Sequence, residues 1–172
     1  MNHTLSWKLA TAGTVAITTA ALCSAGLASA STSAPAVSNS GTEHFYLMTT
    51  QPSASKYSII ASGVFTTGGL DIAGGATDTA RVKGGTFKIH HGGAFHIIKQ
   101  SVNPKTCLAQ FEATASFTLG GGTGAYKKLT GSGKAVISEL AIAPRGRNGA
   151  CNLNGNPVIN EETITGTARV RL

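Results

Sequence analysis

The sequence predicts an all-β domain, a barrel or sandwich of about eight short strands without helices of normal length. Short segments typical of strands recur, and glycine or proline residues separate them. The last segment alternates most clearly, with Ile164, Gly166, Ala168, Val170 and Leu172 on one face and Thr and Arg residues on the other. Alternation with a period of two indicates strands with one buried face. Closure into a barrel would also remove exposed edge strands.

Residues 1–30 are expected to be a cleaved secretory signal peptide. Lys8 precedes a long apolar stretch that ends in Ala28-Ser29-Ala30, a small-x-small pattern typical of signal cleavage. A permanent membrane anchor is disfavoured because the stretch is rich in alanine and threonine rather than leucine. A lipid anchor at Cys23 is disfavoured because Leu22 stands where a small residue is expected. We therefore expect a secreted protein without stable membrane insertion after cleavage.

The mature chain divides into a short leader and one domain. Residues 31–42 are small and polar, and we expect them to form a disordered leader. Residues 43–172 form the barrel domain. Its 130 residues are enough for a single hydrophobic core without metals.

The first four strands are expected at residues 43–50, 56–67, 77–82 and 86–91. Pro52 ends the first strand, and the pair Gly68-Gly69 interrupts the chain after the second. The pair Gly84-Gly85 leads into the fourth strand. The other four strands are expected at residues 94–102, 107–119, 133–143 and 161–172, with Gly92-Gly93 as a two-residue hairpin turn and Pro104 as the next break.

Cys107 and Cys151 are the two cysteines that follow the signal peptide. In an oxidising compartment such a pair is expected to form a disulfide. The alternative, a nucleophilic thiol, is disfavoured in a secreted chain with only two cysteines.

The charge pattern argues against nucleic-acid binding. The net charge is +7, or +6 without Lys8, but the basic residues are scattered and aromatic residues are few. Single-strand binders need aromatic stacking platforms along a basic groove. We expect a solvated basic surface, with weak attraction to anionic cell-surface polymers as the alternative.

The most glycine-rich stretch is "FTLGGGTGAYKKLTGSG", residues 117–133. Gly120, Gly122 and Ala125 match a relaxed dinucleotide fingerprint, but such a site needs a following helix, and Gly131 and Gly133 allow only one helical turn. We therefore predict no bound nucleotide. The glycines would supply positive φ angles at a corner between two strands.

This stretch resembles the signature hairpin of the allene oxide cyclase barrel-like and dirigent-like proteins. "GGTFKIHH", "NPKTCLAQFEATASFTL" and "EETITGTARVRL" are similar to other strands of that family. The resemblance implies a single eight-stranded antiparallel β-barrel with short helical turns only, a ligand-sized interior, no cofactor and a dimeric or trimeric state. It also implies that an enzyme of this type would be an isomerase or cyclase. No catalytic residue of the family can be matched to a position here.

Four residues are candidates for ligand binding: His91, His96, Glu112 and Tyr126. In the expected hairpin His91 and His96 share an apolar face, where they could be structural, contact a ligand, act in acid–base chemistry or bind a metal. We predict no metal site, because a third ligand is not placed by the sequence. Glu112 either lines the barrel or lies on the wet face beside Thr114, and Tyr126 either contacts a ligand or fixes the glycine-rich turn.

Three functions remain open from the sequence. The first is a secreted barrel that binds a small apolar ligand, and the second is a cofactor-independent isomerase or cyclase. The third is a structural or cell-surface protein whose barrel is filled. An open apolar interior with buried ionisable groups would favour the second, and one without such groups the first. Segments that are apolar on both faces, such as Ile97-Ile98, also predict a homo-oligomer.

Overall fold

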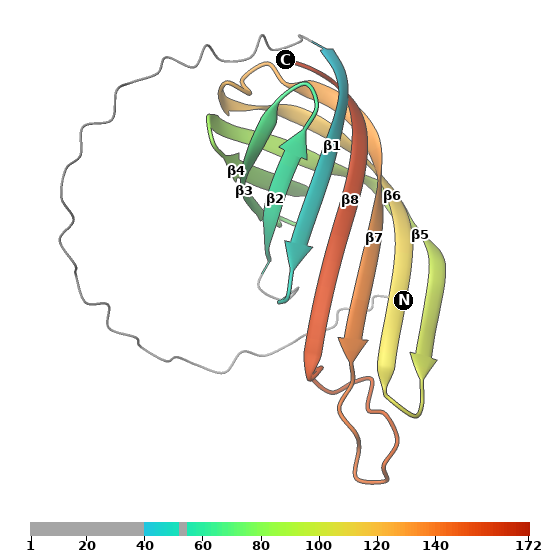
Figure 1. Cartoon of the computed structure of the whole chain (residues 1–172). Helices are drawn as coiled ribbons and strands as arrows, with labels where there is room; N and C mark the ends of the chain where they lie inside the picture. The colour runs from blue at the N-terminus through green and yellow to red at the C-terminus, as the bar shows by residue number, and fades with distance from the viewer. Residues whose placement is uncertain (1–39, 52–54) are drawn as a thin grey trace, which may run out of the picture. The chain divides into compact units, whose positions relative to one another are not determined.

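The computed structural model describes residues 40–51 and 55–172. The predicted signal peptide and residues 31–39 of the predicted leader lie outside this range. The described residues form a closed barrel of eight antiparallel strands, as expected from the sequence (Figure 1). Ser40, Gly41 and Thr42, which the sequence analysis assigned to the leader, already belong to the first strand.

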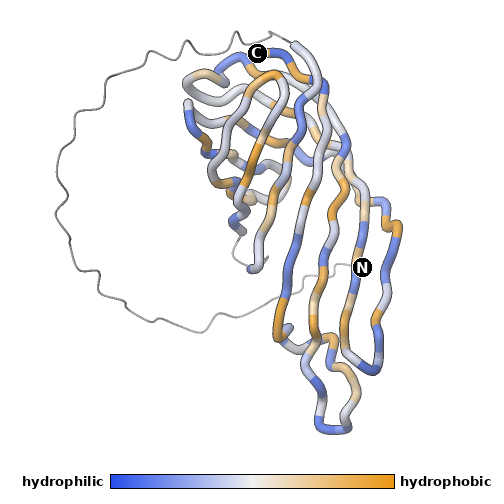
Figure 2. Tube along the Cα trace, in the orientation of Figure 1, coloured by the Kyte–Doolittle hydropathy of each residue, from blue (hydrophilic) through white to orange (hydrophobic). Residues whose placement is uncertain are grey.

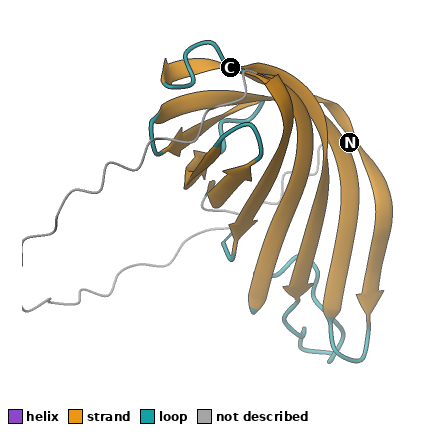
Figure 3. Ribbon diagram, turned by 45° about the horizontal axis from the view of Figure 1, so that its top comes forward, coloured by secondary structure: helices purple, strands orange, loops and turns teal. Residues whose placement is uncertain are grey.

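The strands follow one another around the barrel in chain order, and β1 closes it by pairing with β8. Strands and loops make up the whole described chain, without a helix (Figure 3). Accordingly, no helix among the described residues is long and apolar enough to cross a membrane. The strand bounds are β1 Ser40–Thr49, β2 Lys56–Ser62, β3 Thr66–Ile72, β4 Thr77–Val82, β5 Gly85–Asn103, β6 Leu108–Gly124, β7 Thr130–Ile142 and β8 Ile159–Arg171.

Three of the predicted strand limits are wrong, and all three errors come from reading glycines within a strand as turn residues. The predicted strand at 56–67 is two strands, because the chain turns at residues 63–65. Gly69 lies within β3, where a Cβ atom would come within 2.1 Å of the carbonyl oxygen of Arg81. Glycine there permits a close approach of two backbones and does not end the strand.

The second error concerns the predicted hairpin at Gly92-Gly93. Residues 85–103 form one continuous strand, β5, which pairs along its length with β6. The register shifts between Gly92 and His96, so the two glycines mark a β-bulge. This bulge has a direct effect on the candidate site, as described below.

One half of the barrel interior is filled by aromatic side chains. Phe45, Phe65, Phe87, Phe117 and Tyr126 contact one another with ring centroids 5.2–6.4 Å apart. All five are at most 8% exposed. Edge-to-face contacts of this kind stabilise a core by about 0.5–1.5 kcal/mol per pair beyond the burial of area. We call these five residues the aromatic cluster.

The third error concerns the glycine-rich stretch, because β6 continues to Gly124, five residues past its predicted end, and the corner between β6 and β7 is residues 125–129. Gly124, the last residue of β6, has the predicted positive φ, 60°, whereas Gly120, Gly121 and Gly122 lie within the strand without one. Leu129 is fully buried, and the Tyr126 hydroxyl donates a hydrogen bond to the carbonyl of Lys83 at 3.0 Å. Lys127 and Lys128 are exposed. The corner therefore closes one end of the barrel with its own side chains.

Strands β5–β8 continue beyond the ends of β1–β4 (Figure 1). β4 pairs with β5 only as far as His90, so residues 92–103 pair with β6 alone within the described chain. Hydrophobic residues continue along this extension in Figure 2, and Phe95, Ile97 and Ile98 are 53–57% exposed. β5 therefore ends in an unpaired edge with exposed apolar side chains.

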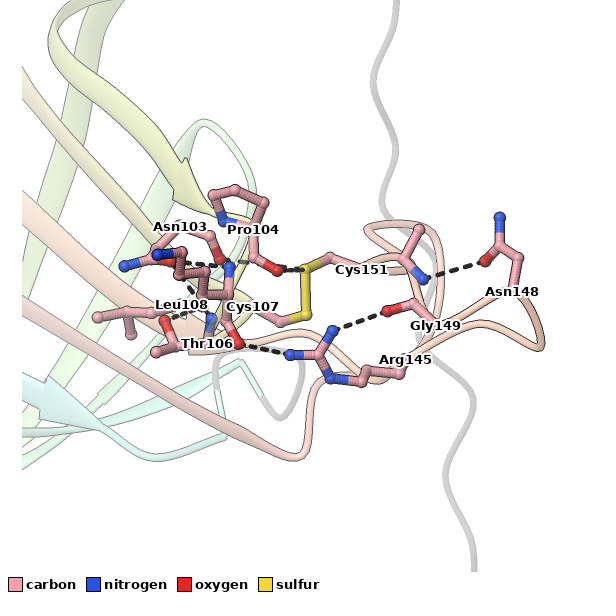
Figure 4. Close-up of a disulfide and its surroundings, with 11 residues drawn as sticks. Asn103, Pro104, Thr106, Cys107, Leu108, Arg145, Asn148, Gly149 and Cys151 are labelled. Atoms are coloured by element: carbon pink, nitrogen blue, oxygen red, sulfur yellow. Dashed lines mark hydrogen bonds between the residues drawn. A yellow bond between two sulfur atoms is a disulfide. The ribbon is translucent and has the colours of Figure 1, made fainter.

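The predicted disulfide between Cys107 and Cys151 is present and lies at the far end of this extension (Figure 4). It joins the start of β6 to the loop between β7 and β8, with Cα atoms 5.3 Å apart. Arg145 of the same loop donates hydrogen bonds to the carbonyls of Gly149 and Lys105. The bridge and this arginine together hold the loop against the β5–β6 turn.

Candidate functional site

The half of the barrel away from the β6–β7 corner contains a cavity of about 230 Å³. Phe45 and Phe117 of the aromatic cluster form part of its wall. The cavity reaches exposed residues of β5 around the bulge, Gly92, Gly93 and Phe95. Most of the remaining wall is apolar or small: Leu47, Ala73, Ile89, Ala115, Ala135, Ile137, Ile164 and Gly166.

Five ionisable side chains also line the cavity, Tyr57, Asp71, Asp78, His91 and Glu162. Their positions follow from the strand register. Tyr57 on β2 stands directly opposite Asp71 on β3, and Asp78 on β4 is a diagonal neighbour of Asp71, which pairs with Ala80. His91 on β5 is likewise diagonal to Asp78, which pairs with Ile89. Side chains at such positions share one face of a sheet and lie within reach of one another.

Asp78 and His91 form the shortest polar contact at this site. The Nε2 atom of His91 lies 2.6 Å from Oδ2 of Asp78. The other carboxylate oxygen of Asp78 accepts a hydrogen bond from the N–H of Gly74 at 2.9 Å. The Asp78 side chain is 10% exposed and that of His91 is 40% exposed. This pair therefore connects the interior of the cavity with its solvent-facing side.

Asp71 is the most deeply buried carboxyl group of the cavity, at 1% exposure. Burial raises its pKa to about 7, and the negative charge of Asp78 adds to the rise, whereas His91 and the N–H of Ile72 oppose it. Its Oδ1 atom has no hydrogen-bond partner among the described residues. Asp71 can therefore gain or lose a proton close to neutral pH.

Tyr57 and Glu162 form a second polar pair across the cavity. The Tyr57 hydroxyl donates a hydrogen bond to Oε2 of Glu162 at 3.0 Å. Burial raises the pKa of both groups. Glu139 stands directly opposite Glu162 in the β7–β8 register, and its charge raises the pKa of Glu162 further. The polar side of the cavity thus carries closely spaced acidic groups.

The structure separates the two candidate histidines. His91 lines the cavity. His96 pairs with Thr114, which lies on the face of β6 opposite to the cavity-lining residues Ala115 and Phe117, so His96 points away from the cavity. The bulge between Gly92 and His96 replaces the expected hairpin and puts the two side chains on opposite faces. They do not form one site.

The other two candidates also lie outside the cavity wall. Glu112 shares the outer face of β6 with Thr114 and stands opposite Ser138 of β7. Tyr126 belongs to the aromatic cluster and fixes the β6–β7 corner. Among the described residues no group of three His, Cys, Asp or Glu side chains is placed to hold a metal ion.

Tyr57, Asp71, Asp78 and Glu162 are site residues that were not expected from the sequence. A usable signal existed for Asp78, because it alternates with Thr77 and Thr79 and so shares the face of Ala80. No such signal existed for Asp71. Of the two adjacent residues Leu70 and Asp71, the apolar leucine would be expected to face inward, but it is the exposed one and Asp71 is buried. Glu161 and Glu162 are adjacent, and the sequence does not indicate which of them points inward.

Comparisons with known proteins add no assignment to this geometry. No family model matches the chain, and no significant match was found among curated proteins or among solved structures.

Proposed function

We propose that this barrel binds a small, mainly apolar ligand that carries one polar group. The observation that supports the proposal is the division of the interior, in which the aromatic cluster fills one half and leaves an apolar cavity with buried polar residues in the other. Apolar walls with a few convergent polar groups are typical of ligand sites. A purely structural barrel would be expected to fill both halves.

The cavity volume limits the size of the ligand. A cavity of about 150 Å³ can hold benzene, so 230 Å³ suits one aromatic ring with a short side chain. We propose that the ring would contact Phe45 and Phe117, and that the polar group would lie toward Tyr57, Asp71 and Glu162. This orientation places each part of the ligand against a wall of matching polarity.

Binding of 2-phenylethanol, measured by nuclear magnetic resonance titration, tests the proposal. We expect saturable binding by the native chain. Ala115→Phe should weaken it by at least about tenfold, because Ala115 is a partly exposed residue of the cavity wall and a phenyl ring there would occupy the cavity.

Thr114→Phe is the matched control, because Thr114 lies on the opposite face of the same strand. Binding should persist in this variant. Equal affinities of the native chain and Ala115→Phe would contradict binding in the barrel, as would the absence of binding by every small aromatic probe.

A second candidate function is a cofactor-independent isomerase or cyclase, which the buried ionisable groups of the open cavity favour by the criterion set from the sequence. Binding of the ligand in this cavity is the step that both functions require. The second function is favoured by Asp71, whose pKa of about 7 suits a group that exchanges protons at neutral pH. The family resemblance described above agrees with this reaction class but does not assign a residue. Mass spectrometry of ligands extracted from protein purified from its own host would supply the substrate. If the native chain and Asp71→Asn convert that ligand at equal rates, Asp71 does not transfer protons in the reaction.

We further propose that the protein is exported and that copies of it associate as a dimer or trimer. The disulfide supports export, because such bonds persist mainly in oxidising compartments. Amino-terminal sequencing of the exported protein should begin at Ser31, and an intact residue 1 would contradict signal cleavage. The unpaired edge of β5 and its exposed apolar side chains support association.

A further inference from the structure

Acidic residues are concentrated in the cavity to an extent that the composition does not explain. The chain has seven Asp and Glu residues against fourteen Lys and Arg. Three of the seven, Asp71, Asp78 and Glu162, line this one cavity, and none of the Lys or Arg residues in the described part of the chain does. Glu139 is next to Glu162 in the register. His91 is the one basic side chain on the described wall.

These carboxyl groups differ in how many hydrogen bonds the protein gives them. Asp78 uses both oxygens, one with Gly74 and one with His91. Glu162 accepts from Tyr57. Asp71 is 99% buried, and its Oδ1 atom has no partner among the described residues. A buried acceptor without a donor is costly, and a bound donor group at this position would remove the cost.

On these grounds we propose that the ligand is a small hydrophobic amine, bound as its ammonium ion beside Asp71. This inference rests on the proposed ligand-binding function and specifies the chemical class of the ligand. An ammonium group has three donors and no acceptor, which complements a wall that offers carboxylate oxygens. Its charge also compensates the carboxylates, whereas the anionic group of a fatty acid or phosphate ester would face Asp71, Asp78 and Glu162 without a lysine or arginine on the described wall.

The apolar part of such a ligand has a defined place. Phe45 and Gly166 are paired across β1 and β8, and Glu162 lies four residues earlier in β8, where it pairs with Thr49 at the end of β1. The acidic groups are therefore displaced from the aromatic cluster toward the end of β1. The aromatic ring of an arylalkyl amine would lie against the cluster, and its ammonium group would lie at the carboxylates.

Three probes of similar size and different charge test the inference: 2-phenylethylamine, 2-phenylethanol and 3-phenylpropanoate. Calorimetric titration at pH 8 should show the amine binding at least about tenfold more tightly than the alcohol, because its hydrogen bonds are charge-assisted. The carboxylate should bind more weakly than both. Equal or tighter binding of the alcohol would overturn the amine proposal and leave ligand binding intact. Failure of all three probes would overturn both.

The pH dependence supplies a second readout. Asp78, His91, Tyr57, Glu162 and Glu139 are the titratable groups that face Asp71 or its acidic neighbours from the other strands. Below pH 7 Asp71 takes up a proton, so the preference for the amine over the alcohol should fall between pH 8 and pH 5. A preference that stays constant over this range would contradict pairing with Asp71.

Two matched variants test whether the carboxylate of Asp71 is the group that pairs with the ammonium ion. Asp71→Asn should lower the ratio of amine affinity to 2-phenylethanol affinity at pH 8 at least about tenfold, because it removes the carboxylate charge with which only the ammonium group pairs. Glu112→Gln removes one carboxylate from the outer face and should change neither affinity. Thermal unfolding of each variant confirms that it is folded. An Asp71→Asn variant that keeps the full preference for the amine would overturn the proposal.

Discussion

At Asp71 the barrel buries a carboxyl group that has an ordinary pKa near 4 in the unfolded chain and about 7 in the folded one. The folded state therefore binds a proton more tightly than the unfolded state. Between these two pKa values the folded state carries the extra proton, so stability falls as the pH rises through this window. The group is neutral and costs little at low pH, and it is charged and costly above pH 7.

Asp71→Asn should therefore stabilise the protein at pH 8 and have little effect at pH 4. A difference of about three pKa units corresponds to at most about 4 kcal/mol, because each unit is about 1.4 kcal/mol. Urea unfolding at both pH values measures the effect. If Asp71→Asn lowers the free energy of unfolding at pH 8 by as much as it does at pH 4, or by more, the predicted direction of the pH effect is wrong. Glu112→Gln is the control for loss of a carboxylate on the outer face.

Residues of the site could be predicted from the sequence only where alternation is clean. His91 was selected because alternation puts it on the same face as Phe87 and Ile89, and it does line the cavity. Glu112 and Tyr126 were selected as well, but the strand pairing places them on the outer face and in the aromatic cluster. Asp71 was missed because an apolar residue beside it, Leu70, lies on the outside. The alternation of apolar and polar residues shows which face of a strand is buried, but it does not show which polar residues also lie on that face.

At the level of the elements, the disulfide connects the two loops at the far end of the extension formed by β5–β8. Cys107 is 1% exposed and precedes β6, whereas Cys151 belongs to the long loop between β7 and β8. Other hydrogen bonds hold this loop only at a few points, such as those of Arg145. Without the covalent bond the loop would gain conformational freedom in the unfolded chain and lose its attachment in the folded one.

Replacement of both cysteines, Cys107→Ala with Cys151→Ala, should lower the free energy of unfolding by about 2–4 kcal/mol. Urea unfolding with and without a reducing agent provides the comparison. The reducing agent should destabilise the native chain and leave the double variant unchanged. Identical urea midpoints for the native chain and the variant under oxidising conditions would show that the bond has no stabilising effect.

The eight strands were predicted in number, but two errors in their limits compensated each other. One predicted strand, 56–67, is divided between β2 and β3, and two predicted strands, 86–91 and 94–102, are both part of β5. Both errors arise because the pairs Gly68-Gly69 and Gly92-Gly93 each have a sequence that is typical of a turn. Whether a glycine pair turns the chain or lets another backbone approach depends on the neighbouring strand, which lies elsewhere in the sequence.

For the whole molecule, closure of the barrel leaves part of β5 with a neighbour on only one side among the described residues. The pairing of β1 with β8 removes two potential edges, but residues 92–103 of β5 extend past β4 and keep unpaired backbone groups. Exposed apolar side chains on such an edge favour pairing with another chain. The all-β barrel could be predicted from alternation and turn spacing, whereas this overhang could not, because it depends on the unequal lengths of β4 and β5.

The double variant Ile97→Lys with Ile98→Lys should shift a dimer or trimer toward the monomer, because charged lysines oppose pairing of edge strands. Sedimentation velocity over a range of concentrations measures this change. Leu70→Lys is the matched control, because Leu70 is 49% exposed on β3, away from the β5 edge. A native chain that stays monomeric at high concentration would contradict association.

The closed corner between β6 and β7 also has a kinetic consequence. Tyr126, Leu129 and the aromatic cluster fill that end of the interior, so a bound molecule would enter and leave on the side of the β5 bulge. It would enter with its ring first and leave with its polar group first. Because differences in affinity appear mainly in the dissociation rate, contacts of the ring with the aromatic wall and of the polar group with Asp71 and Glu162 would both slow the exit of the ligand.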